Sequence, residues 1–110
     1  MAAISETEIH VELRNAEAAL ATLGERETRL WERVKITPTQ WRHNQYPNVG
    51  PVWVVAVMGK RCLYYNAVEG GWGWGRFESW GIVADYHWQQ DEIQHAIHFL
   101  LFAIDNGGMG

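Results

Sequence analysis

The stretch Val52-Trp-Val-Val-Ala-Val-Met58, followed by Gly59-Lys60 and then Arg61-Cys-Leu-Tyr-Tyr-Asn66, decides the fold class of this chain. The first segment is apolar on both faces, which is typical of a central β-strand that is covered on both sides. A two-residue turn that begins with glycine is typical of a hairpin. Because side chains alternate along a strand, Leu63 and Tyr65 are expected on one face of the returning strand. The stretch therefore predicts an antiparallel hairpin at the centre of a sheet.

A helix is predicted before this hairpin. Ser5 and Glu8 have the spacing of a capping box. Apolar residues then follow at alternating intervals of four and three and form one narrow stripe: Ile9, Leu13, Ala16, Leu20 and Leu23. Gly24 is typical of a helix end, so we favour a break there over a helix that continues to about Val34. A stripe of this kind is also compatible with a homodimer that pairs the first helix with its own copy.

The segment between the first helix and the hairpin is harder to assign. Leu30 to Ile36 is either a second helical segment or a first strand, and its β-branched residues favour the strand. Thr37-Pro38-Thr39-Gln40 has the pattern of a second, smaller capping box with proline in the first helical position, which predicts one helical turn that carries Trp41. Arg42 to Pro51 is polar and rich in turn residues, so a loop is predicted there.

The last part of the chain predicts short strands and a second long helix. Phe77 to Tyr86 predicts one or two strands, interrupted at Gly81. Gln90 to Ile104 predicts a helix with a wide apolar face, which Phe99 and Phe102 widen further, so we expect it to be more buried than the first helix. Residues 1–110 therefore predict a single α+β domain, in which an N-terminal and a C-terminal helix pack on a short antiparallel sheet of three to five strands.

Tryptophan is the unusual component, with seven copies in 110 residues. Seven indoles do not all fit deep in so small a core, since each N–H group needs a partner when it is buried. From Glu69 to Arg76 the chain reads Glu-Gly-Gly-Trp-Gly-Trp-Gly-Arg, and this glycine content predicts irregular structure. One interpretation is a mobile loop that presents Trp72 and Trp74 to a partner, because aromatic residues are enriched at binding hot spots. The other is that one or both rings fold back over the sheet.

Charge and hydropathy narrow the class of partner. The net charge is −4, and the nine Lys and Arg residues form no dense cluster in the sequence, so no nucleic acid is expected. The longest apolar run, Phe99 to Ile104, is too short to cross a bilayer, and the acidic N-terminal residues do not have the pattern of a signal peptide. We expect a cytoplasmic protein that does not bind a membrane.

No group of residues predicts catalysis or a cofactor. Cys62 lies in an apolar strand, where a plain buried thiol is more common than a nucleophile. Asp91, His95 and His98 share one side of the last helix, and we favour a polar stripe there over a metal site. The glycines around Trp72 do not have the spacing of a nucleotide-binding loop. We therefore predict no enzyme activity, no metal and no cofactor.

Four segments carry a resemblance: Trp53-Val54-Val55-Ala56-x-x-Gly59, Tyr65-Asn66-x-x-Glu69-x-Gly71, Gly81-x-Val83 and Gln90-Asp91-Glu92-Ile93. Together they resemble a group of small uncharacterised bacterial proteins, and some proteins of that size and style are similar to immunity proteins that neutralise toxins of competing cells. The resemblance implies a bacterial immunity-type protein that binds a toxin. Ala67 stands where related sequences tend to have an acid, and no catalytic residue is implied.

The function we expect is therefore that of a non-enzymatic protein-binding domain. An acidic protein attracts a basic partner over a distance, and a nuclease toxin would be such a partner. The alternative is a domain that binds a small ligand, a sugar or a metabolite, in an aromatic pocket. The candidate binding residues for these two functions are Tyr65, Asn66, Glu69, Trp72, Trp74 and Trp80.

Overall fold

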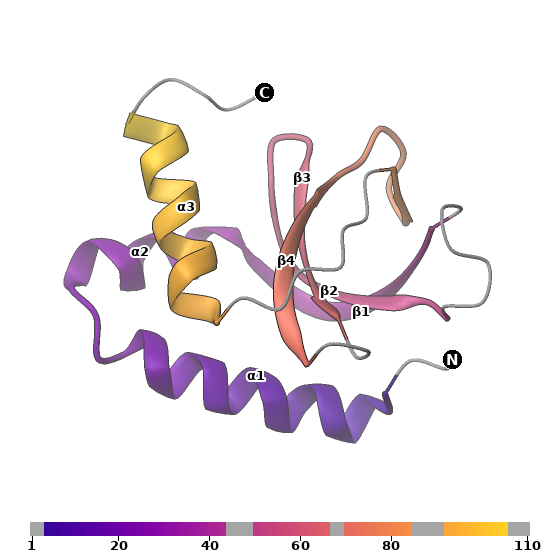
Figure 1. The fold of residues 1–110 in the computed structure, drawn as a ribbon, viewed down its shortest axis with the longest axis horizontal. Helices are drawn as coiled ribbons and strands as arrows, with labels where there is room; N and C mark the ends of the chain where they lie inside the picture. The colour runs from indigo at the N-terminus through magenta and orange to yellow at the C-terminus, as the bar shows by residue number, and fades with distance from the viewer. Residues whose placement is uncertain (1–3, 44–49, 67–69, 85–91, 106–110) are drawn as a thin grey trace.

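The computed structural model describes residues 4–43, 50–66, 70–84 and 92–105 (Figure 1). These residues form an α+β fold in which three helices pack on one face of a curled sheet. In chain order the elements are α1 (Glu6–Leu20), α2 (Glu25–Val34), β1 (Lys35–His43), β2 (Val52–Met58), β3 (Arg61–Asn66), β4 (Gly71–Arg76), β5 (Ile82–Val83) and α3 (Ile93–Asp105).

The sheet has five strands in the order β4-β3-β2-β1-β5. All neighbouring strands are antiparallel except β1 and β5, which are parallel, so the sheet is mostly antiparallel, as predicted. The hairpin of β2 and β3 has the predicted bounds, and its turn contains Gly59 at a φ of 58°. That backbone angle is one that glycine adopts without steric cost. The central position of β2 explains why its sequence is apolar on both faces.

The two faces of the sheet carry two separate hydrophobic clusters. Leu63 and Tyr65 belong to the cluster beneath the helices, whereas Cys62 and Tyr64 belong to the cluster on the opposite face, so the predicted alternation is confirmed. In β2 the pairing register shifts between Val54 and Ala56. A bulge of this kind interrupts the alternation of side chains, and it explains why residues 55 and 56 both contact the helix-side cluster.

Helix α1 begins as predicted. The Glu8 backbone N–H donates to Ser5 Oγ at 3.1 Å, and the Ser5 N–H donates to Glu8 Oε1 at 3.3 Å, which completes the capping box. The helix ends at Leu20, and the break at Gly24 is confirmed, although Gly24 is the N-cap of α2 and does not end α1. The apolar stripe packs on the chain's own core, with Ile9 fully buried, so it is not exposed for pairing with a second copy.

The favoured strand at Leu30 to Ile36 is wrong over its first five residues, because helix α2 continues to Val34. Leu30, Trp31 and Val34 lie at helical spacing and are all buried on the helix-side cluster. Burial of one face in this way contributes more than the weak preference of β-branched residues for strands. Strand β1 begins at Lys35, directly after the last residue of α2.

The predicted helical turn at Thr37–Gln40 is also wrong, because these residues belong to β1. Pro38 lies where the pairing of β1 with β2 shifts in register, between Lys35 and Thr39. A proline is tolerated in a strand at such an irregularity, since no ladder hydrogen bond is needed from it there. Of the predicted loop that follows, Arg42 and His43 are in β1, and residues 44–49 lie outside the described residues.

The C-terminal predictions are confirmed in part. Of the predicted range Phe77 to Tyr86, the structure describes residues 77–84, and within these Ile82–Val83 forms strand β5, which Gly81 precedes at a φ of 95°. Helix α3 has the predicted buried face, while Gln90 and Asp91 lie outside the described residues. The expected contribution of Phe99 and Phe102 to that face is wrong, since their side chains are 48% and 68% exposed. They lie one turn apart on a side of α3 that faces away from the core.

Three indole N–H groups connect the helices to the rest of the fold. Trp31 Nε1 donates to Glu17 Oε2 at 2.8 Å and joins α2 to α1. Trp53 Nε1 donates to the Ile4 carbonyl at 2.8 Å and joins β2 to the residue before α1. Trp74 Nε1 donates to the Ala96 carbonyl at 2.9 Å and joins β4 to α3. Each of these rings is largely buried, so the N–H group has the partner that burial requires.

Candidate functional site

The segment around Trp72 and Trp74 is an edge strand and not a presenting loop. Residues Gly71–Arg76 form β4, which pairs with β3 along its whole length. Both tryptophan rings are buried beneath the helices, at 5% and 8% exposure. The loop prediction is wrong because tryptophan and glycine alternate with the period of a strand. The rings lie on the helix-side face, and the glycines alternate with them and are buried as well.

The structure brings only some of the candidate residues together. The rings of Tyr65 and Trp72 meet edge to face, with centroids 5.0 Å apart. Trp80 lies on the opposite side of the sheet, where it contacts Trp41 at 4.9 Å between centroids and is 64% exposed. Asn66 is the last residue of β3, opposite Gly71. Glu69 lies outside the described residues.

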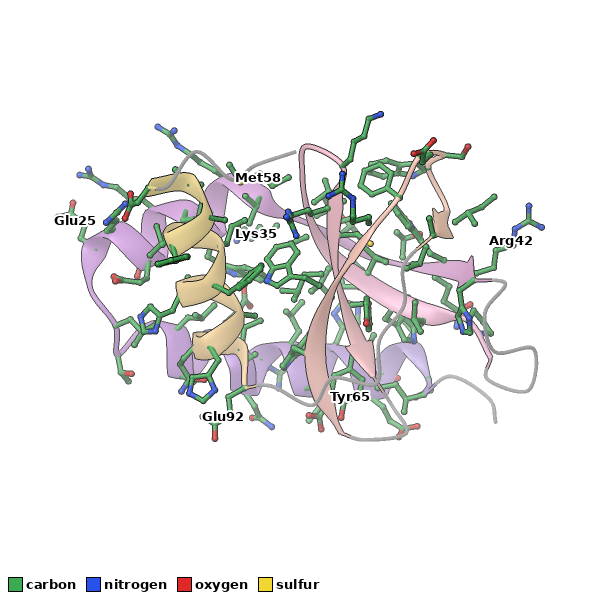
Figure 2. The ribbon with its side chains drawn as sticks, turned by 45° about the horizontal axis from the view of Figure 1, so that its top comes forward. Glu25, Lys35, Arg42, Met58, Tyr65 and Glu92 are labelled. Atoms are coloured by element: carbon green, nitrogen blue, oxygen red, sulfur yellow. The ribbon has the colours of Figure 1, made fainter. Side chains whose placement is uncertain are left out.

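Tyr65 and Trp72 border two hollows along α1, which we call the α1 groove. The first has a volume of about 200 Å³ and is lined by Ile4, Thr7, Glu8, Val11, Glu12 and Tyr65. The second has a volume of about 270 Å³ and is lined by Glu12, Asn15, Ala16, Ala19, Gly70, Trp72, Glu92, Ile93 and Gln94. Glu12 borders both hollows. Figure 2 shows Tyr65 from the sheet and Glu92 from the start of α3 beside α1.

Three carboxylates give the α1 groove its charge. Glu8 and Glu12 lie one turn apart on α1, and Glu92 faces the second hollow from the start of α3. In the described part of the chain, no Lys, Arg or His side chain forms an ion pair with any of the three. The potential in the groove is therefore negative and is not neutralised from within these residues.

The carboxylates also act on the tyrosine between them. Burial raises the pKa of the Tyr65 hydroxyl, and the charge of Glu12, a hydrogen bond with Glu12 and the charge of Glu8 raise it further. The hydroxyl therefore stays protonated and donates to a carboxylate. This contact joins two residues that line the first hollow, Tyr65 and Glu12, and the exposed Val11 lines it as well.

Cys62, His95 and His98, the described residues that were candidates for catalysis or metal binding, do not line the α1 groove. Cys62 is buried, and burial raises its pKa to about 12, so the thiol is not ionised near neutral pH. His95 and His98 are exposed on α3, and His98 Nε2 lies 4.0 Å from Glu27 Oε1. Asp91 is outside the described residues, within which no three His, Cys, Asp or Glu side chains are grouped to hold a metal ion.

The carboxylates of the α1 groove are not among the residues that the sequence predicts for a site. Glu8 has its predicted capping role, and its i, i+4 spacing from Glu12 is the local signal that the two carboxylates share a face. Glu92 is brought to the same groove only by the tertiary fold, which no local pattern reveals.

Comparison with known proteins identifies no relative of this chain. The chain matches no known protein family, no curated protein and no solved structure. Among the helices of the described residues, none combines the length and the apolar character that a membrane crossing requires. The α1 groove is therefore the basis on which a function is assigned.

Proposed function

We propose that this chain is a non-enzymatic protein-binding domain that holds a basic partner protein against the α1 groove. The observation that carries the proposal is the set of three carboxylates around two hollows that are bordered by aromatic rings. Acidic surfaces of this kind accelerate the encounter with a basic partner and favour its correct orientation.

The chemistry of the α1 groove suits arginine and lysine side chains. A guanidinium group donates to a carboxylate in bidentate geometry, and an ammonium group donates to it as a compact charge. Each hollow is lined by a carboxylate and by a largely buried ring: Glu8 and Tyr65 in the first, and Glu92 and Trp72 in the second. Hollows of about 200 and 270 Å³ are smaller than most small-molecule sites, which have volumes of about 300–1,000 Å³. This supports a protein partner over an enclosed sugar or metabolite.

The class of partner follows from the resemblance to immunity-type proteins. A toxin that acts on nucleic acid carries a basic surface, because its substrate is a polyanion. An inhibitor with a negative groove would be complementary to that surface and would compete with the substrate. We therefore propose a toxin of this kind as the partner of the α1 groove.

The test is the substitution Glu12→Lys, because Glu12 borders both hollows and is only partly buried. Basic proteins encoded beside the gene for this chain are purified, and their binding is measured by surface plasmon resonance at several salt concentrations. Reversal of one charge in a desolvated contact is expected to weaken binding at least about tenfold. The association rate of the wild-type chain is expected to fall as salt rises, since screening weakens steering.

The matched control is Glu78→Lys, an equal change of charge at an exposed residue that does not line the groove. It should leave the affinity nearly unchanged. Equal weakening by both substitutions would show an effect of net charge alone, and the α1 groove would then not be the binding site.

A further inference from the structure

The tip of the β2–β3 hairpin brings together cations that are far apart in the sequence. Arg61 and Arg76 are direct partners across the β3–β4 ladder, and Lys60 precedes Arg61 in the turn. Both arginines are expected on the helix-side face, since Arg61 is two residues from Leu63 in β3 and Arg76 is two residues from Trp74 in β4. Like charges placed directly opposite each other in a sheet are destabilising. An anion bound between them would relieve this repulsion.

No acid within the described residues neutralises these cations. None of the carboxylates there forms an ion pair with Lys60, Arg61 or Arg76. Arg61 Nε is buried without a hydrogen-bond partner in this part of the chain. The Arg61 guanidinium lies over the ring of Phe99, 5.8 Å from the ring centroid. This stacking holds the guanidinium in place while its charge stays available to a partner.

Exposed aromatic side chains adjoin the cations. Phe99 is 48% exposed and Phe102, one turn further along α3, is 68% exposed. We call these five residues the cationic tip: Lys60, Arg61, Arg76, Phe99 and Phe102. The α1 groove lies near the start of α3 and the cationic tip toward its end, so the two surfaces are separate (Figures 1 and 2).

We propose that the cationic tip is a second docking surface, which binds an acidic segment of a partner protein that also carries an apolar side chain. Carboxylates would accept from the two arginines, and the apolar side chain would cover Phe99 and Phe102. Three cations suit a short acidic peptide. They are fewer than the four to eight that anionic membrane surfaces recruit and the roughly six to ten phosphate contacts of DNA-binding proteins.

The experiment uses the full chain and a defined probe. The probe is a fluorescein-labelled twelve-residue peptide of glutamate and leucine, and its control is the same peptide with glutamine in place of glutamate. Binding is followed by fluorescence anisotropy in low salt. We expect the glutamate peptide to bind and the glutamine peptide to bind at least about tenfold more weakly, because charge-assisted hydrogen bonds carry the recognition.

Variants of the chain locate the binding surface. Arg76→Glu, at an exposed position, should weaken binding of the glutamate peptide about tenfold, and Phe102→Ser should weaken it several-fold. Arg42→Glu is the matched control, since Arg42 points outward at the far end of the sheet (Figure 2), and it should have little effect. Circular dichroism confirms that each variant is folded.

Several outcomes would overturn the proposal. These are equal binding of the two peptides, equal weakening by Arg42→Glu, and binding to phosphatidylserine vesicles without binding to the peptide. Self-association of the chain that is lost in Arg76→Glu would also overturn it, because the occupant would then be a second copy. Glu12→Lys should not weaken peptide binding, so failure at the cationic tip is distinguishable from failure at the α1 groove.

Discussion

At the scale of single residues, His43 links the stability of the fold to pH. Its side chain is buried at the end of β1, and burial lowers its pKa, while a hydrogen bond with the Gly50 backbone opposes this shift. An unfolded histidine titrates near pH 6.5. Below that pH the unfolded chain binds a proton that the folded chain resists, so the stabilisation is complete above about pH 6.5 and is lost as pH falls.

The prediction is that the urea midpoint of the wild-type chain falls between pH 7 and pH 5, and that His43→Gln makes this dependence shallower. Equilibrium unfolding in urea at several pH values, followed by tryptophan fluorescence, is the measurement. His95→Gln serves as control, because His95 is exposed on α3. A dependence equally steep in wild type and His43→Gln would show that His43 is not its source.

Trp74 gives a second prediction at this scale. Trp74→Phe removes the donor to the Ala96 carbonyl and leaves part of a buried ring volume empty. A lost buried hydrogen bond and a cavity together cost about 2–4 kcal/mol of unfolding free energy. Trp80→Phe, at a ring that is 64% exposed, should change stability by less than about 0.5 kcal/mol. Chemical denaturation of both variants tests the difference, and similar losses would contradict the burial of Trp74.

At the scale of secondary structure, the N-terminus of α2 can be stabilised by a side-chain cap. Gly24 is its N-cap, with backbone angles that any residue adopts and no side-chain cap, and Glu27 lies three residues later. Gly24→Ser would complete a capping box and should stabilise the chain by about 0.5 kcal/mol, which raises Tm by about 2–4 °C. A new Cβ would meet only the flexible end of Glu27, at 2.8 Å from Oε2.

Calorimetry of Gly24→Ser and of the control Gly81→Ser measures the change in Tm that each substitution causes. Gly81 has a φ of 95°, where a residue with a side chain is strained, so that substitution should lower Tm. If Gly24→Ser also lowered Tm, the assignment of Gly24 as N-cap would be wrong.

The elements also show what a local pattern can predict. α1, β2, β3 and the buried face of α3 were predictable, because caps, turns and apolar periodicity agree within each segment. The errors at α2, at β1 and at β4 arise where local preference and tertiary contact disagree. Trp31 buries its ring within a helix although Val34 and Ile36 favour a strand, and β4 forms a strand although glycine is a poor strand former.

At the scale of the whole molecule, two separate surfaces carry opposite charge. The α1 groove is negative and the cationic tip is positive. The net charge of −4 is a sum over the whole sequence and does not reveal either local charge. No local sequence pattern predicts this division, because Arg61 and Arg76 become neighbours only through the register of β3 and β4. The same holds for Glu12 and Glu92, which line the same hollow only because α1 and α3 pack together.

The three indole hydrogen bonds have a consequence for recognition. Hydrophobic contacts alone allow a helix to slide or rotate on a sheet, whereas each of these bonds is directional and contributes one fixed point. The walls of the α1 groove are therefore held at a set spacing before any partner arrives. Binding there should require little ordering of the domain, so that most of the contact energy is retained as affinity.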